Sequence, residues 1–281
     1  MSKGDKWGAF VSGSGTFGNV SGAANLSNFN FETGGVTAGL DYRFNDQLVV
    51  GVYGGYGHTE ANYDLGSRTR VDAGKFGLYG TWYKKGFYVD GIAGGSINSY
   101  EMRQNLNFSG INRTAVGNLQ AWEFDGFLDT GYDWQIGRFT FGIFGSLQYV
   151  HLSVDGFTET NAGALSLAVA QNSAESLRQQ VGARLGYVWK INSFVTIAPE
   201  IRIAWQHEYL DRSRTIFASL DRGDGPGLSF TGAAGQHDDA YATVGLNGSI
   251  GKLGVYLLYN SAFGSSTFES NAVAGGVRFQ F

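Results

Sequence analysis

The chain has no cysteine, only two prolines and few charges, since 16% of its 281 residues are Asp, Glu, Lys or Arg. Without cysteine, thiol nucleophiles, zinc–thiolate centres and disulfide frameworks are excluded. Long apolar runs are also missing: no stretch of 18 uncharged apolar residues occurs, which excludes a helical membrane span. There is no run of five basic residues, and the net charge is −4. Both observations argue against nucleic acid as a partner.

Glycine and aromatic residues are abundant instead, with 44 Gly, 21 Phe, 15 Tyr and 6 Trp. A hydrophobic content of 43% is too high for a disordered chain, so the chain folds and covers its aromatic side chains. Low charge without long apolar runs is typical of a membrane β-barrel.

The first residues (MSKGDKW) lack the apolar segment of a secretory signal, so we expect that Met1 is not the native start. Residues 1–6 are interpreted as a residual linker or an artificial start. Residues 7–281 are interpreted as one barrel domain.

A period of two, typical of strands, recurs along the chain and is cleanest over residues 121–136, 177–190 and 195–207. In each of these segments one face is apolar and the other is polar or small. These strands exceed the usual 5 to 6 residues, and they are long enough to cross a bilayer at a tilt. Twelve strands are predicted, at residues 7–18, 31–44, 48–57, 71–84, 87–98, 121–135, 139–152, 177–190, 195–207, 240–250, 253–261 and 269–281.

Tight turns alternate with long loops between these strands. The predicted turns are residues 45–47, 85–86, 136–138, 191–194 and 251–252. In an up-and-down meander this alternation places every tight turn at one end and every long loop at the other, as in bacterial outer-membrane barrels. A soluble sandwich would show Lys, Glu and Thr on its polar face, whereas these faces carry Gly, Gln, Asp and Arg. The predicted fold is therefore all-β, a 12-stranded antiparallel transmembrane β-barrel of the outer membrane.

The polar faces carry acids and arginines that we predict to line the lumen. Such charges can set a field across the lumen and hold a polar or charged segment. Alternatively, they pair with one another and stiffen the barrel. The predicted lining is Glu123, Asp125, Asp129, Asp133, Arg178, Arg184, Glu200, Arg202 and Arg278.

Aromatic residues near strand ends suit the girdles at the membrane interfaces, where an amphipathic ring sits half in water. The predicted interfacial residues are Trp82, Trp134, Trp189, Trp205 and Tyr259.

One sequence feature favours an enzyme. His151 and Ser153 share a strand face and resemble the His-x-Ser spacing of outer-membrane phospholipase A, with Asn161 as a candidate third member. The strand phase, however, places His151 with Leu147 and Tyr149 on the lipid side. An interfacial histidine beside a loop is the favoured interpretation, and neither a catalytic residue nor a cofactor is predicted.

Three further patterns are weak. Gly13, Gly15 and Gly18 match G-x-G-x-x-G, but no helix follows as dinucleotide binding requires. Residues 164–180 contain good helix formers and suggest a short helix or a hairpin in an external loop. A cation could bind at the base of the loop 208–237, but solvated loop ends are favoured and no metal is predicted. The residues concerned are His207, Glu208, Asp211, His237, Asp238 and Asp239.

The C-terminus reads SNAVAGGVRFQF, with Val273, Val277, Phe279 and the terminal Phe281 on one face. It resembles the closing strand by which outer-membrane proteins are recognised for assembly. Further stretches extend the resemblance to the C-terminal β-domain of classical monomeric autotransporters (type Va secretion) over essentially the whole chain. They are WGAFVSGSGTFG from Trp7, FETGGVTAGLDYRF from Phe31, KFGLYGTWYKKGFYVDG from Lys75, LQYVHLSVDGFTE from Leu147, SLRQQVGARLGYVW from Ser176 and PEIRIAWQHEY from Pro199.

The resemblance implies a monomeric translocator in the Gram-negative outer membrane, accompanying secretion of an N-terminal passenger, with a linking helix in the lumen. The implied partners are outer-membrane lipids and lipopolysaccharide, the barrel-assembly machinery, and the passenger with its linker helix. The chain as given has no passenger, and residues 1–6 are too short for the lumen helix. A free-standing diffusion channel or a surface adhesion barrel is the alternative.

Overall fold

The computed structural model describes residues 6–21, 27–108, 110–210, 215–220, 227–231, 237–263 and 268–281. Within these ranges the chain forms strands and two 3-10 turns, η1 (Asp64–Gly66) and η2 (Gly163–Leu165). No helix of the described residues is long and apolar enough to span a membrane. Residues 1–5 of the predicted linker lie outside the described residues. The strands are β1 (Trp7–Val20), β2 (Phe29–Arg43), β3 (Leu48–Tyr63), β4 (Arg68–Lys84), β5 (Phe87–Phe108), β6 (Ile111–Ile136), β7 (Phe139–Val154), β8 (Phe157–Thr158), β9 (Leu167–Val169), β10 (Asn172–Tyr187), β11 (Trp189–Lys190), β12 (Val195–Glu208), β13 (Thr215–Leu220), β14 (Leu228–Thr231), β15 (Asp238–Ile250), β16 (Leu253–Phe263) and β17 (Phe268–Gln280).

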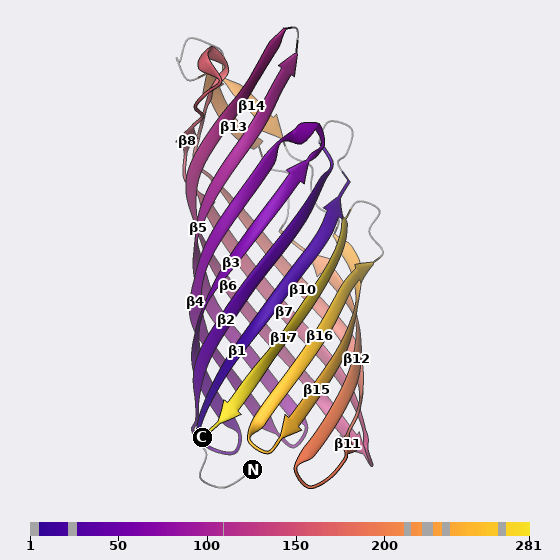
Figure 1. The fold of residues 1–281 in the computed structure, drawn as a ribbon. Coiled ribbons are helices and arrows are strands. Elements are labelled where there is room, and N and C mark those ends of the chain that lie inside the picture. Colours follow the sequence, from indigo (N-terminus) through magenta and orange to yellow (C-terminus); the bar gives the residue numbers. More distant parts are fainter. Residues whose placement is uncertain are drawn as a thin grey trace.

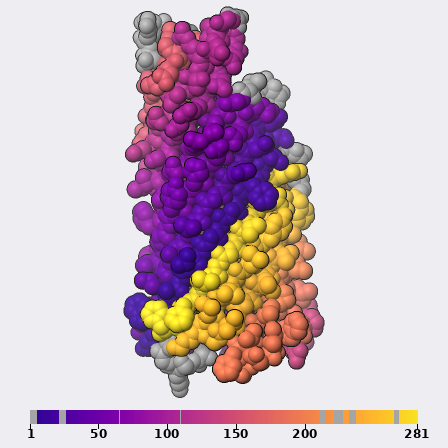
Figure 2. Space-filling view, viewed as in Figure 1, coloured from indigo at the N-terminus to yellow at the C-terminus, as the bar shows by residue number. Residues whose placement is uncertain are grey.

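The large sheet closes on itself. Its strands follow the order β1 to β7, β10, β12, β15, β16, β17, and β17 pairs antiparallel with β1 from Gly8↔Gln280 to Val20↔Phe268. The two-residue β11 continues β10 and pairs with β12. The prediction of a 12-stranded antiparallel barrel is confirmed. Figure 2 shows the N-terminal strands in indigo and the C-terminal strands in yellow side by side on one continuous surface.

The two ends of the barrel differ, as the alternation of turns and loops predicts. Figure 1 shows the start of β1 and the end of β17 at the same end as the tight connections, while the connections that contain β8, β13 and β14 lie at the opposite end. We call these the turn end and the loop end. Between β4 and β5 the turn is made by Lys85 (φ 51°) and Gly86 (φ 90°). Two successive positive φ values match the twist of a hairpin, and glycine adopts them without a Cβ clash.

Several strands are longer than predicted, and all of the extra length except Ile136 lies at the loop end. β5 reaches Phe108 and β6 begins at Ile111, so this hairpin rises beyond its neighbours (Figure 1). In the added part of this hairpin the outward residues are polar, such as Glu101 and Arg103, whereas inward residues such as Ala115 and Leu119 are apolar and buried. The alternation of the membrane part is therefore reversed here, although the strand pairing continues. A second sheet of order β14-β13-β9-β8 lies beyond the barrel at this end.

Of the two structures suggested for residues 164–180, a short helix or a hairpin, the helix is wrong. This segment holds η2, β9 and the first half of β10, and β9 pairs with β8 and β13. Cross-strand pairing overrides the modest helix propensity of these residues.

The distribution of burial is the reverse of that in a soluble protein. Large apolar side chains such as Val36, Phe76 and Ile143 are more than half exposed, whereas Asp41, Asn98 and Gln206 are buried. Because buried polar and exposed apolar residues are the informative exceptions in a soluble protein, this pattern places lipid outside and a polar lumen inside.

Candidate functional site

A partly buried ion pair spans the lumen face of β7. Arg184 of β10 donates from Nε to Asp133 Oδ1 of β6 at 2.7 Å, and its Nη2 contacts Oδ2. The strand between them contributes Gly142, which lies opposite both residues in register. A Cβ at this position would collide with the Asp133 carboxylate and the Arg184 side chain. Glycine therefore lets the pair close over the intervening strand.

A similar ion pair lies where β1 and β17 close the barrel, which we call the closing seam. Arg278 of β17 donates from Nη2 to Asp41 Oδ1 of β2 at 2.6 Å, across β1. Gly8 of β1 lies between them, and a Cβ there would stand 2.6 Å from Asp41 Oδ1 and 2.7 Å from Arg278 Nη2. Tyr79 donates to the other oxygen of Asp41 at 2.7 Å. Asp41 is thus fully buried with both oxygens satisfied, and it ties the last strand to the second.

At the loop end Glu208 fastens β12 to β10. Its carboxylate accepts hydrogen bonds from Ser176 Oγ (2.5 Å), the Leu177 amide (2.9 Å), Arg178 Nε (3.1 Å) and the Leu210 amide (3.0 Å). Burial alone would raise the pKa of Glu208, but these donors outweigh burial and lower it to about 2. The remaining predicted arginine, Arg202, pairs with Glu200 on its own strand at 2.8 Å. All four predicted arginines therefore have carboxylate partners.

The carboxylates of β5 and β6 form a contrasting surface, which we call the acidic wall. It consists of Asp90 of β5 with Glu123, Asp125 and Asp129 of β6. No ion pair involves these four among the residues that the structure describes. Asp90 and Asp129 lie directly opposite in register, and the buried Asp129 Oδ1 has no hydrogen-bond partner.

The acidic wall borders two cavities of the lumen. Glu123, Asp125 and Asp90 line a cavity of about 840 Å³, which Lys75 of β4 also reaches. Asp129 lines a neighbouring cavity of about 220 Å³ with Glu200 and Arg202. The acidic wall therefore presents unpaired carboxylates to open space in the lumen. The four predicted arginines, by contrast, are already paired with carboxylates.

The predicted interfacial aromatics face away from the lumen and divide between the two ends. Trp82, Trp134 and Trp189 lie near the turn end, and Trp205 and Tyr259 lie toward the loop end. Val273, Val277, Phe279 and Phe281 form an outward stripe on and just after β17. The rings of Phe279 and Phe281 stack at 6.2 Å, and the Phe281 amide donates to the Trp7 carbonyl at 2.9 Å.

A repeated polar arrangement at the loop end was not recognised from the sequence. On three strands an aromatic residue and a histidine two positions later both contact one carboxylate on the neighbouring strand. The three sets, which we call the histidine sites, are Tyr56, His58 and Asp72; Tyr149, His151 and Glu175; and Trp205, His207 and Asp238. Each histidine lies directly opposite its carboxylate in register. The aromatic-x-His pattern is visible in the sequence, but the carboxylate partner emerges only once the strands are aligned.

The histidine sites mark the upper edge of the apolar outer band. On β4 the outward positions run from Trp82 through Leu78 and Phe76 before Asp72 introduces the first charge. Ten residues at ~3.3 Å each and a tilt of ~40° correspond to about 25 Å along the barrel axis. That height matches the apolar band of an outer-membrane barrel.

The weak candidates from the sequence are not assembled into sites. His151 contacts Glu175, and its ring lies 5.5 Å from that of Trp122 on the outer face. In the suggested cation cluster, His207 and Asp238 face outward whereas Glu208 and Asp239 face inward, and Asp211 lies outside the described residues. Within the described ranges, no group of three His, Asp or Glu side chains could hold a metal ion. Gly13, Gly15 and Gly18 lie within β1, so no phosphate-binding turn forms.

Comparison with known proteins agrees with this architecture. The family model for the autotransporter beta-domain matches residues 9–260. An extracellular serine protease of Serratia marcescens is 27% identical over 99% of this chain, and the matched region is 26% of that protein. The chain thus spans about a quarter of the length of this relative.

Two solved structures share the fold. The translocator domain of the autotransporter NalP from Neisseria meningitidis superposes with a TM-score of 0.76 at 13% identity, covering 99% of this chain and 90% of that one. The beta domain of the Bordetella autotransporter BrkA gives a TM-score of 0.73 at 16% identity, covering 99% and 100%. With its closed barrel, inverted burial and matching family model, the chain belongs to the autotransporter beta-domain family and is a translocator barrel of the Gram-negative outer membrane.

Proposed function

We propose that the acidic wall receives the segment that links the barrel to its exported passenger. The observation that carries the proposal is the division of the lumen charges. Arg178, Arg184, Arg202 and Arg278 are neutralised by carboxylates, whereas the acidic wall faces open space without ion-pair partners. A segment in this lumen gains most by turning Lys, Arg or amide donors toward β5 and β6.

The unpaired carboxylates are costly for the empty barrel. Asp90 and Asp129 face one another directly, and like charges in opposing positions destabilise a sheet. Donors from a second segment would relieve this repulsion and satisfy Asp129 Oδ1. The barrel itself acts as a conduit and a holder, without chemistry of its own.

A passenger-display assay tests this proposal. A reporter passenger fused ahead of Lys6 is followed on the surface of a Gram-negative host by antibody labelling, normalised to the amount of folded barrel. E123Q/D125N removes two charges from the acidic wall and should reduce display severalfold. E32Q/E269Q, which removes two exposed charges from the outer face, is the matched control and should leave display unchanged. Equal display by the two variants would contradict the proposal.

The outward stripe of Val273, Val277, Phe279 and Phe281 is proposed as the signal for the barrel-assembly machinery. All four side chains are exposed on the closing strand, and Phe281 provides the final hydrogen bonds to Trp7. Phe281→Ala keeps those backbone bonds but removes the ring, so it should lower the yield of heat-modifiable folded barrel in membranes. Phe263→Ala, which removes an exposed ring from β16, is the control. Unchanged yield in Phe281→Ala would remove the basis for this role. A monomer suffices for both proposals, because the large sheet closes within one chain.

A further inference from the structure

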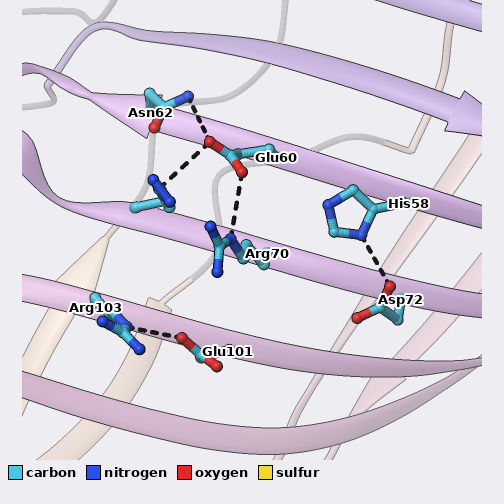
Figure 3. A network of polar contacts seen from close by, with 8 residues as sticks. His58, Glu60, Asn62, Arg70, Asp72, Glu101 and Arg103 are labelled. Carbon is cyan, nitrogen blue, oxygen red and sulfur yellow. Dashed lines mark hydrogen bonds and ion pairs between the residues drawn. The ribbon is translucent and has the colours of Figure 1, made fainter.

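Charged residues on the outer face gather above the apolar band on β3, β4 and β5. In register they form three rows, which we call the charged grid. The lowest row is His58–Asp72–Ser99, the middle row is Glu60–Arg70–Glu101, and the row nearest the loop end is Asn62–Arg68–Arg103. Figure 3 labels seven of these side chains on neighbouring strands, with Glu60 between Asn62 and Arg70.

The row nearest the loop end is a cationic pair without a carboxylate of its own. Arg68 and Arg103 are directly opposite, an arrangement that repels unless an anion lies between them. Arg68 approaches only Glu60, at 3.4 Å, and Glu60 is shared with Arg70 at 3.3 Å. Arg103 contacts Glu101 through Nε at 2.7 Å, and its side chain is 57% exposed. In the described part of the chain, the terminal nitrogens of these arginines make no hydrogen bonds, so they are available to a ligand.

The location of the charged grid selects an amphiphilic ligand. Phe76 and Ile97, on the same outer face directly below, are about 60% exposed. A molecule that touches both this apolar surface and the arginine row must carry a hydrocarbon body and an anionic head. Guanidinium groups bind phosphate bidentately, which makes a phosphorylated head the best match.

The other histidine sites lack this arginine row. Beyond the His151–Glu175 pair, the next outward residues in register are Ser153 and Ser173. Beyond the His207–Asp238 pair, Tyr209 packs against the His207 ring at 4.5 Å. On the described strands, outward arginines above the band occur only in the charged grid, so the feature belongs to one side of the barrel.

We propose that Arg68 and Arg103 form a binding site for a phosphorylated outer-leaflet lipid headgroup, that of lipopolysaccharide, assisted by Arg70. The site holds one lipid against β3–β5 and anchors this side of the barrel in the outer leaflet. The inference depends on the outer-membrane location of the barrel and is independent of what the lumen receives, so its failure would leave the proposed export role intact.

Native mass spectrometry of the detergent-purified barrel tests the site, with bisphosphorylated lipid A as the probe and its dephosphorylated form as the comparison. The unaltered barrel should bind one bisphosphorylated lipid and bind the dephosphorylated one at least tenfold more weakly. R68Q/R103Q should weaken binding of the bisphosphorylated lipid at least tenfold. R138Q/K190Q, which removes two exposed positive charges at the turn end, should bind it normally.

A single variant guards against misfolding. R103Q removes only an exposed ion pair, so the barrel should fold, and its lipid binding should fall several-fold. Equal binding by the R68Q/R103Q and R138Q/K190Q variants would overturn the proposal, as would equal binding of the phosphorylated and dephosphorylated lipids. Displacement of the lipid by millimolar inorganic phosphate would show a free-anion site instead. A dimer lost in R68Q/R103Q without bound lipid would show that a second copy occupies the surface.

Discussion

The lumen contains two groups of carboxylates, and they differ in whether an arginine lies beside them. Around β10, β12 and β17 each arginine has a carboxylate within hydrogen-bonding distance. In the acidic wall Asp90 and Asp129 face one another, and Glu123 and Asp125 face open space. The difference teaches that a charge inside a barrel is structural when its partner is built into the next strands. A charge left without one is available to a ligand.

Breaking the pair across β7 should have the largest effect on stability. Asp133→Ala leaves the largely buried Arg184 guanidinium without its carboxylate partner, which costs up to about 3 to 5 kcal/mol in unfolding free energy. Urea unfolding in lipid vesicles, followed by tryptophan fluorescence, measures the change. Asp125→Ala on the acidic wall is the control and should cost far less. Similar losses in the two variants would erase the distinction between the two parts of the lumen.

Acid should lower the stability of the barrel by protonating Glu208. Its folded pKa of about 2 lies below the ordinary 4.5, so its stabilisation is complete above pH 4.5 and disappears as the pH falls through about 2. At neutral pH the contribution is about 3 kcal/mol. Glu208→Gln should lose this amount at pH 7, and the gap to the unaltered barrel should narrow as the pH drops from 4.5 toward 2. Urea unfolding midpoints of both proteins at several pH values measure this difference. A difference in stability that does not change with pH would contradict the lowered pKa of Glu208.

Adding a methyl group at Gly142, beneath the Asp133–Arg184 pair, should lower the unfolding free energy less than removing the pair does. Gly142→Ala forces Asp133 and Arg184 to move apart, at about 1 to 3 kcal/mol. The same unfolding assay applies. Gly126→Ala on β6 is a matched control, because a Cβ there meets nothing within 4 Å. If the two alanine variants unfolded alike, the role of Gly142 in closing the pair would be wrong.

The smallest change in stability is expected on the acidic wall. E123Q/D125N should alter the unfolding free energy by less than about 1 kcal/mol, because neither carboxylate has an ion pair to lose. Its effect should appear in planar bilayers as a lower preference for cations over anions. Reversal potentials in a salt gradient measure that preference. A large loss of stability with unchanged selectivity would show that Glu123 and Asp125 have a structural role, as the ion-paired carboxylates do.

Within the membrane the sequence predicts the fold well, because lipid outside and a polar lumen inside make every strand alternate. Trp134 and Asp133 are assigned to opposite faces by that alternation alone. Above the apolar band the outward face is polar, as at Arg103, and the inward face is apolar and buried, as at Ala115 and Leu119. The alternation expected for the membrane part is thus reversed, although the strand pairing continues. The ends of β5 and β6 therefore could not be predicted.

The candidate site was only partly accessible from the sequence. The inward acids and arginines follow from strand phase. Which arginine meets which carboxylate depends on register across an intervening strand, as for Arg184 and Asp133 over Gly142. The histidine sites depend on register in the same way. A sequence contains the residues of such contacts but does not state the alignment that joins them.

The pairing of β1 with β17 makes this seam unlike the others in its kinetics. Strands adjacent in sequence meet after short connections, whereas Asp41 and Arg278 are 237 positions apart. Loop-closure entropy rises by ~0.6 kcal/mol per doubling of length, so this seam costs roughly 3 kcal/mol more to join than a hairpin. The strands should therefore assemble first as an open, twisted sheet with two unsatisfied edges. Joining those edges, with Asp41 and Arg278 meeting across Gly8, is the step that commits the chain to its barrel.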